Sequence, residues 1–280
     1  MTSTPRFDEA LRSAIKREVL ALAPGRLLPA ISHFEPPPEV STNGQASHKR
    51  NNFGALVLED GTVGMTYVAL DGALEGLRTN LGPPEGQGLK GSEVMSLADL
   101  YTSDVGWERA IGLAAVNAAS QWLLSQRGPL APAPSTLPML DLTSGDRVGM
   151  VGHFGRLLDP IRSAGASLTV IELDESLVRE EPSLVVTLDH RQLRACNKII
   201  ITGTTLLNQT LDDVLAHCRQ AEQVNLLGPS ASCIGEPLFE RGVTRVGGFQ
   251  VKDTEAFLAA WRRGQGWRDA GLRYSLCRED

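Results

Sequence analysis

Residues 147–172 constrain the fold of this chain more than any other segment. Two short apolar runs, 148–151 and 168–171, predict buried strands, and glycines followed by a helix-like stretch separate them. The Asp159-Pro160 pair predicts the start of that helix, because aspartate is a favoured N-cap and proline is tolerated at the first helical position. Gly165 predicts its end. This strand, helix and strand are typical of the opening unit of a parallel sheet.

The turn after the first strand reads Gly152-His153-Phe154-Gly155, and the acidic Glu172 follows twenty positions after its first glycine. This spacing resembles part of the dinucleotide fingerprint G-x-G-x-x-G, but the middle glycine is missing. A side chain at that point would crowd a pyrophosphate, which needs close approach of the backbone. The turn therefore predicts a Rossmann-like shape and leaves nucleotide binding open.

Composition narrows the class of protein. The chain has 280 residues, 42% of them hydrophobic, which favours two domains with proper cores. Its net charge of −6 comes from interspersed acids and bases, so no basic surface for nucleic acid or an anionic membrane is expected. The four cysteines form no C-x-x-C pair, and no apolar run reaches the roughly 18 residues of a membrane span. These features predict a reduced, cytoplasmic protein without a membrane segment.

The first half of the chain predicts an α+β unit. Apolar residues at helical spacing predict a helix over 7–22. The segment 26–52 is rich in proline, serine and asparagine, which is typical of loop or loosely paired strand. Residues 53–58 and 62–70 flank an Asp-Gly turn and predict a hairpin. An alanine-rich stretch, 104–126, predicts a long helix that packs across the sheet.

The Pro/Ala-rich run that begins at residue 128 is the clearest change of composition and predicts an extended spacer. We therefore expect an α+β domain over 1–127, a linker over 128–145 and a Rossmann-like α/β domain over 146–280. The sheet of the second domain should be mainly parallel and covered on both faces, because strands and helices alternate. Further strands are predicted at 184–188, 198–202, 223–227 and 243–246.

Three loops that leave the carboxyl ends of predicted strands carry small polar groups, and ligands bind at these ends in doubly wound sheets. From these loops we expect the ligand-binding residues to be His153, Phe154, Gly203, Thr204, Thr205, Asn208 and Ser230. The glycine-rich segment 82–92 predicts a lid or a linker, and Lys90 and Glu93 could reach across the cleft between the domains.

Several of these residues could serve the fold instead of a ligand. His153 could be a metal ligand, an acid or base, or a capping side chain. The threonines and Asn208 could instead cap the following helix. Cys233 could be a soft metal ligand, although a lone thiol more often serves packing. No H-x-x-H or H-E-x-x-H zinc motif is present.

The order of several motifs resembles a known family. The Rossmann-like half resembles the domain described as "Putative heavy-metal chelation", and the helix before it resembles one in a small domain similar to the N-terminal domain of enolase. The motifs that carry the resemblance are GMVGHF at 149–154, ITGTTLLNQTL at 201–211, LGPSAS at 227–232, PLFERG at 237–242, GG at 247–248 and, upstream, AIGLAAVNA at 110–118.

The resemblance implies a cleft between two domains and a role in handling a metal ion or a metal-containing cofactor. Our leading hypothesis is a protein that binds a divalent transition metal, of unknown identity, or a metal-chelating small molecule in this cleft, with His153 as the metal ligand. One alternative is an enzyme that uses a nucleotide or S-adenosylmethionine, and another is a non-catalytic assembly module. Whether the protein is an enzyme stays open, as does homo-oligomerisation.

Overall fold

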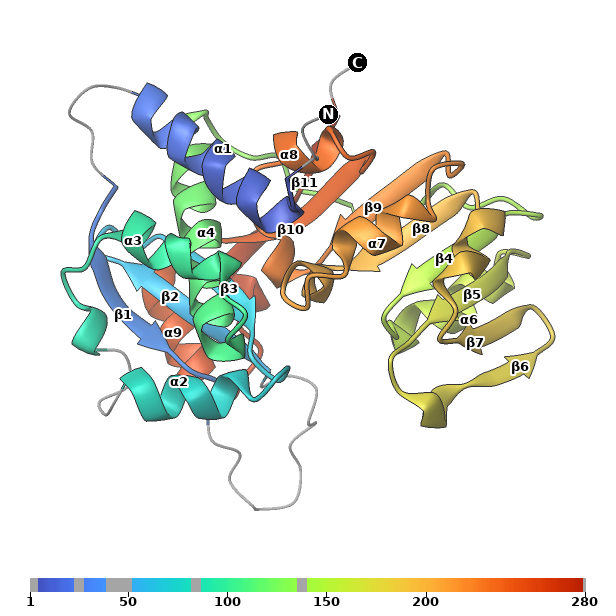
Figure 1. Cartoon of the computed structure of the whole chain (residues 1–280), viewed down its shortest axis with the longest axis horizontal. Helices are drawn as coiled ribbons and strands as arrows, with labels where there is room; N and C mark the ends of the chain where they lie inside the picture. The colour runs from blue at the N-terminus through green and yellow to red at the C-terminus, as the bar shows by residue number, and fades with distance from the viewer. Residues whose placement is uncertain (1–4, 23–27, 39–51, 82–86, 135–139, 279–280) are drawn as a thin grey trace.

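The computed structural model describes residues 5–22, 28–38, 52–81, 87–134 and 140–278 (Figure 1). Two sheets organise them. The helices are α1 (Phe7–Ala21), α2 (Ala73–Leu81), α3 (Val94–Ala98), α4 (Gly106–Gln126), α6 (Gly155–Ser163), α7 (Leu211–Ala216), α8 (Glu236–Phe239) and α9 (Thr254–Arg262). Short 3-10 helices are η1 (Gln87–Leu89), η2 (Asp99–Thr102), η3 (Glu175–Leu177), η4 (His190–Ala195), η5 (Gly203–Leu206), η6 (Pro229–Ala231) and η7 (Arg268–Ala270).

The smaller sheet is antiparallel and has the order β1-β2-β3, with strands β1 (Ile31–Glu35), β2 (Phe53–Leu58) and β3 (Val63–Tyr67). Its last two strands form the hairpin that the Asp-Gly turn predicts, and Gly61 takes the positive φ of 86° that such a turn needs. β1 lies inside the segment that we expected to be loop or loosely paired strand.

The larger sheet has eight strands in the order β11-β10-β9-β8-β4-β5-β7-β6. The six strands from β10 to β7 are parallel, whereas the two edge strands are antiparallel. The expected mainly parallel sheet is therefore confirmed. Its strands are β4 (Arg147–Val151), β5 (Ser167–Ile171), β6 (Arg179–Glu181), β7 (Leu184–Thr187), β8 (Lys198–Thr202), β9 (Gln223–Leu227), β10 (Arg245–Val251) and β11 (Gly271–Cys277).

The order of the larger sheet creates one special position. From β4 the chain adds β5 and then β7 on one side, and it then returns to add β8, β9 and β10 on the other side. The loops after β4 and β8 consequently lead away from each other and leave a crevice at the carboxyl ends of these two strands. This crevice is where a doubly wound sheet holds its ligand.

Helix α4 packs against β2 and β3 of the smaller sheet and against η6, which follows β9 of the larger one (Figure 1). All its residues from Arg109 to Leu124 are buried. The helix approaches β3 so closely that a Cβ at Gly64 would lie 2.1 Å from the carbonyl oxygen of Ala114. The Asn117 amide nitrogen donates to the carbonyl oxygens of Met65 and Ser230, at 2.7 and 2.9 Å, and so links both halves of the chain.

The cores of the two halves are continuous. One hydrophobic cluster runs from α1 and α4 to one face of the larger sheet, and a second cluster lies on the other face under α6. A third joins the outer face of the smaller sheet to β10 and α9. The predicted linker is partly structured, because the Ala133 amide donates to the Arg273 carbonyl oxygen of β11 at 2.8 Å. Residues 135–139 of that linker lie outside the described residues, and the domain boundaries stay a prediction.

Two local predictions about α6 have different outcomes. The helix begins at Gly155, so the expected start at Asp159-Pro160 is wrong, and Pro160 lies inside the helix. Proline there removes one hydrogen bond of the helix, to the carbonyl group of Arg156, which is an exposed residue. The expected stop is confirmed, since Gly165 has a φ of 82°.

Among the described residues, none of the helices has both the length and the apolar character that crossing a membrane would require.

Candidate functional site

A cavity of about 370 Å³ lies at the crevice between the carboxyl ends of β4 and β8. Its walls come from the loops after β4, β5, β7 and β8 and from the end of β3 in the smaller sheet. The lining residues are Tyr67, Leu70, Val151, Gly152, His153, Phe154, Ile171, Glu172, Leu173, Asp174, His190, Thr202, Thr204, Thr205, Asn208 and Thr210.

Gly152 allows the ends of the two central strands to meet. Its φ is 85°, a conformation that side chains rarely adopt, and a Cβ there would lie 2.9 Å from Cγ2 of Thr202. A larger residue would therefore be strained and would push against the end of β8. The glycine places the turn after β4 directly beside the loop after β8.

His153 lines this cavity in the turn after β4, next to Phe154, which stands two positions after Gly152, where a dinucleotide-binding turn has its middle glycine. Its ring lies beside the first residue of α6, with Cε1 3.3 Å from the point that a Cβ of Gly155 would occupy. The ring nitrogen Nε2 is buried and has no hydrogen-bond partner within the described part of the chain. A buried polar atom without a partner costs about 1–3 kcal/mol, so a ligand that contacts this nitrogen would offset that cost.

Phe154 provides an apolar wall of the cavity next to His153. It immediately precedes α6, and its half-buried ring packs against the hydrophobic cluster under that helix.

The polar residues after β8 line the cavity together, as the sequence suggested. Several of their groups are already engaged locally. The Thr205 hydroxyl donates to the Thr202 carbonyl oxygen at 2.8 Å, and the Thr204 hydroxyl lies 3.1 Å from the Thr202 hydroxyl. The Asn208 side-chain oxygen accepts from the Thr210 hydroxyl at 2.7 Å. This leaves the Asn208 amide nitrogen as the group best placed to donate to a ligand.

Gly203 and Ser230 are not among the lining residues. A Cβ at Gly203 would lie 2.8 Å from the backbone nitrogen of Ala231, so this glycine lets η5 pack against η6. Ser230 is 1% exposed, its hydroxyl is buried, and its backbone carbonyl oxygen accepts from Asn117 of α4. The predicted ligand contacts of these two residues are therefore absent from the cavity as it stands.

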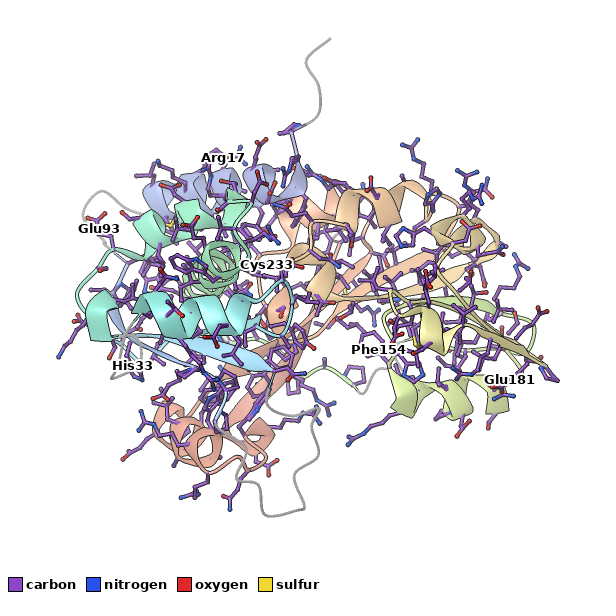
Figure 2. All side chains as sticks on the ribbon, turned by 60° about the horizontal axis from the view of Figure 1, so that its bottom comes forward. Arg17, His33, Glu93, Phe154, Glu181 and Cys233 are labelled. Atoms are coloured by element: carbon purple, nitrogen blue, oxygen red, sulfur yellow. The ribbon has the colours of Figure 1, made fainter. Side chains whose placement is uncertain are left out.

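Lys90 and Glu93 lie beside the smaller sheet, next to the edge of β1, where the backbone of Ser92 pairs with Ile31. Glu93 and Phe154 are labelled at opposite sides of Figure 2, and neither Lys90 nor Glu93 lines the cavity. The reason is that η1 and the residues directly after it pack along β1. Residues 82–86 of the predicted lid lie outside the described residues.

Sequence reasoning missed the part of the cavity that the smaller sheet supplies. Tyr67 ends β3 and lines the cavity, and its hydroxyl accepts from the Asn52 amide nitrogen at 3.1 Å. Its ring meets that of Phe53 edge-on, with centroids 5.4 Å apart. No local pattern marks Tyr67 as a site residue, because only the packing of one half on the other brings it to the crevice.

Arg109 of α4 holds the smaller-sheet side of the cavity against the loop after β8. The side chain is buried and donates from Nε to the carbonyl oxygen of Leu207 at 2.5 Å, while one terminal nitrogen contacts a carboxylate oxygen of Asp71 at 2.8 Å. Leu207 precedes Asn208, and Asp71 follows Leu70, so one guanidinium holds two walls of the cavity together. Arginine suits this task, since its planar fork donates in several directions.

The charges around the cavity are acidic. Glu172 and Asp174 follow β5, His190 follows β7, and none of the described lining residues is a lysine or an arginine. Hydrogen bonds from the Ser176 hydroxyl and backbone amide lower the pKa of the exposed Asp174 carboxyl below its usual value. The cavity therefore favours a neutral or positively charged ligand.

Across the part of the chain that the structure describes, no three histidine, cysteine or acidic side chains gather closely enough to hold a metal ion. Histidine and carboxylate groups do line the cavity, on loops that follow different strands. The described lining consequently does not fit a bare metal ion held entirely by protein ligands, which takes at least three such groups.

Comparisons with known proteins agree with this architecture. The chain resembles two solved structures of proteins of unknown function. One, from Desulfitobacterium hafniense, has a TM-score of 0.65 at 20% identity, with 96% of this chain and 99% of that chain covered. The other, from Pyrococcus horikoshii, has a TM-score of 0.66 at 16% identity, with 97% and 100% covered.

An uncharacterized protein of Methanocaldococcus jannaschii is 28% identical over 167 residues, which make up 59% of this chain and 62% of that protein. Two family models, both described as "Putative heavy-metal chelation", match residues 51–120 and 135–275. The second match covers half of the chain, and both structural relatives carry the name of its family, DUF364. The chain thus belongs to the DUF364 family, described as "Putative heavy-metal chelation".

Proposed function

We propose that this protein binds an organic metal chelator, or its complex with a transition metal, in the cavity between β4 and β8. The family description suggests a metal, and the cavity offers space and polar groups for a small molecule. Its volume of about 370 Å³ lies in the range of about 300–1,000 Å³ that is usual for small-molecule sites.

The lining supports a chelated metal better than a free one. A free ion would need several protein ligands on one spot, and the described residues do not provide them. A chelator brings most of the coordination sphere itself and leaves one position for the protein. The apolar walls formed by Val151, Ile171 and Phe154 would then contact the organic part of the complex.

His153 is the observation that carries this proposal. It is a half-buried imidazole on the cavity wall, and its Nε2 has no partner within the described residues. Imidazole nitrogen is a good ligand for zinc, copper, iron and nickel. A rotation of the side chain would bring this nitrogen to a metal centre in the cavity, and coordination would replace the missing hydrogen bond.

The test uses isothermal titration calorimetry on the untagged protein with Zn²⁺, Cu²⁺ and Ni²⁺, each alone and as its 2,2′-bipyridine complex. We expect a complex to bind more tightly than the free ion, and His153→Ala to weaken that binding at least about tenfold, which corresponds to about 1.4 kcal/mol. His217→Ala is the matched control, because this histidine lies at the end of α7 and does not line the cavity. Equal binding by wild type and His153→Ala would refute the ligand role.

A second candidate is an enzyme that uses a nucleotide or S-adenosylmethionine. The supporting observation is Glu172, which directly follows β5 and lines the cavity in the place where a Rossmann fold holds a ribose. Thermal denaturation with each cofactor tests it. At a hundred times its dissociation constant, a ligand should stabilise the fold by about 2.7 kcal/mol.

Three further expectations from the sequence are part of the proposal. We keep the likeness of residues 1–127 to the N-terminal domain of enolase as a comparison of fold only, without enolase chemistry. The division into domains at 128–145 and a cytoplasmic location also stay predictions. Limited proteolysis tests the division into domains, because a protease cuts an exposed linker before it cuts either folded domain.

A further inference from the structure

We propose that the protein has a second small-molecule site, at the turn between β2 and β3, and that this site binds a compound with a primary ammonium group. A cavity of about 220 Å³ lies there, and we call it the hairpin cavity. Its lining comes from residues 60–63 of the turn, from Gln121 and Ser125 of α4, from residues 250–252 at the end of β10 and from Thr254 of α9. None of these residues lines the cavity between β4 and β8, so the two sites are separate.

Two glutamines that line the hairpin cavity each have a buried oxygen without a partner. Gln121 is 2% exposed and Gln250 is 8% exposed, and the side-chain oxygen of each has no hydrogen-bond partner within the described part of the chain. An amide oxygen only accepts hydrogen bonds, so the partner that is missing is a donor. An unpaired buried acceptor destabilises the fold, and two of them in one cavity point to a ligand that donates to both.

The orientation of the Gln121 amide follows from the bonds of its nitrogen. Nε2 donates to the carbonyl oxygen of Ser232 and to the hydroxyl of Tyr274, both at 2.7 Å. The tyrosine hydroxyl has room there because Gly248 has no side chain, and a Cβ at that glycine would lie 2.4 Å from it. A flipped amide would turn its oxygen toward the Ser232 carbonyl oxygen, which repels it. The oxygen is therefore the atom of this amide that a ligand can use.

The hydroxyl groups of the lining already use their protons elsewhere. The Ser125 hydroxyl donates to the Trp122 carbonyl oxygen at 2.7 Å, and the Thr254 hydroxyl donates to the Gly61 carbonyl oxygen at 2.6 Å. A hydroxyl has a single proton to donate, so neither of these groups is free to satisfy a glutamine oxygen.

The charged residues of the lining are one acid and one base, and both are exposed. Asp60 accepts from the Thr62 backbone amide at 2.9 Å through one carboxylate oxygen. Lys252 is the base, and its long flexible side chain can extend into water. The lining thus combines two buried amide oxygens with a carboxylate. A primary ammonium group has three donors and no acceptor, which matches such a set.

The size of the hairpin cavity limits the rest of the ligand. Its volume is below the range of about 300–1,000 Å³ that is usual for drug-sized ligands. It exceeds the roughly 30 Å³ that one water molecule occupies. Val63 and Val251 also line it and offer apolar contact to a short carbon chain. These features favour a small alkylammonium compound.

The experiment compares three cations that carry the same charge. Isothermal titration calorimetry on the untagged protein uses the chlorides of n-propylammonium, tetramethylammonium and potassium at constant ionic strength. We expect n-propylammonium to bind at least about tenfold more tightly than the other two, because only this cation has N–H donors for the amide oxygens. Equal binding of the three cations would overturn the proposal, and so would the absence of measurable n-propylammonium binding.

Variants at Gln250 locate the site. Gln250→Leu removes one acceptor and should weaken n-propylammonium binding about tenfold or more. Gln250→Glu at pH 8 keeps the shape and adds a negative charge, so it should strengthen binding about tenfold. Gln220→Leu is the matched control, because Gln220 is exposed and does not line the hairpin cavity. A thermal melt of each variant shows that it folds.

Unchanged affinity in both Gln250 variants would overturn the proposal, and the charge-adding variant keeps this test available if Gln250→Leu does not fold. His153→Ala, which tests the cavity between β4 and β8, should leave n-propylammonium binding as it is in the wild type. Loss of n-propylammonium binding in His153→Ala would place the cation in that cavity and overturn the second site. The function proposed for His153 is tested with the bipyridine complexes and can therefore fail or stand separately.

Discussion

The two strands that flank the cavity are joined at their other end by a buried ion pair, and its removal should destabilise the whole sheet. Asp146 precedes β4, and Lys198 begins β8. Their side chains are each 7% exposed, and a carboxylate oxygen of Asp146 lies 2.9 Å from Nζ of Lys198. The same carboxylate accepts from the Thr143 backbone amide at 2.7 Å and from the Asn197 amide nitrogen at 2.8 Å.

Asp146→Asn leaves the buried ammonium of Lys198 without its counter-charge. Breaking a buried pair from one side costs about 3–5 kcal/mol, because the remaining charge stays desolvated. We therefore expect Asp146→Asn to lower the free energy of unfolding by about that amount. The double variant Asp146→Asn with Lys198→Met should recover part of the loss, since the uncompensated charge is gone.

The pH dependence follows from the direction of the pKa shift. Burial opposes ionisation of Asp146, but the hydrogen bonds from Thr143, Asn197 and Lys198 outweigh it, and the folded-state pKa lies well below the usual value. The stabilisation is therefore fully present above the unfolded-state pKa of about 3.9 and is lost as the pH falls toward the folded-state pKa. The difference in stability between wild type and Asp146→Asn should shrink below about pH 4.

The assay is urea denaturation followed by tryptophan fluorescence from pH 7 down to pH 3. Asp159→Asn is the matched control, because Asp159 is an exposed aspartate in α6 whose replacement should change stability by less than about 0.5 kcal/mol. Equal stability of Asp146→Asn and wild type at pH 7 would refute the argument. So would a difference that grows as the pH falls.

Three further outcomes are expected. Gly152→Ala should lower the stability measured by calorimetry more than Gly145→Ala does. Both glycines have positive φ, but only a Cβ at position 152 would meet a neighbouring side chain, so equal losses would contradict this. Arg109→Met should cost about 2–4 kcal/mol in urea denaturation, since buried carbonyls lose their donor; a loss below about 0.5 kcal/mol would contradict it. Cys277 should react with Ellman's reagent far faster than Cys218 and Cys233, whose pKa burial raises to about 12, and three equally fast thiols would contradict this.

The sequence was informative where local pattern and tertiary environment agree. The apolar runs of β4 and β5 and the spaced glycines around them predicted a parallel unit, and strands buried on both faces do read as continuous apolar runs. The long helix was expected at 104–126 and is observed as α4, with bounds Gly106–Gln126. Asp253 caps α9 by accepting from the Ala256 amide at 2.9 Å, and aspartate is a favoured residue at this position.

The sequence was least informative where packing between distant segments decides. The sequence did not predict β11. This segment is a strand because it pairs with β10, and its own composition does not mark it as one. Ser230 was expected at the ligand site because it follows β9, but α4 packs over η6 and buries it. Tyr67 lines the cavity because the two halves pack together, and no pattern in the sequence predicts that packing.

The most direct test of the proposed function is a crystal structure of the untagged protein grown with the copper–bipyridine complex, with anomalous diffraction measured at the copper edge. The account predicts a copper peak inside the cavity between β4 and β8, within bonding distance of an imidazole nitrogen of His153. A copper peak elsewhere on the protein, with only water in this cavity, would contradict it.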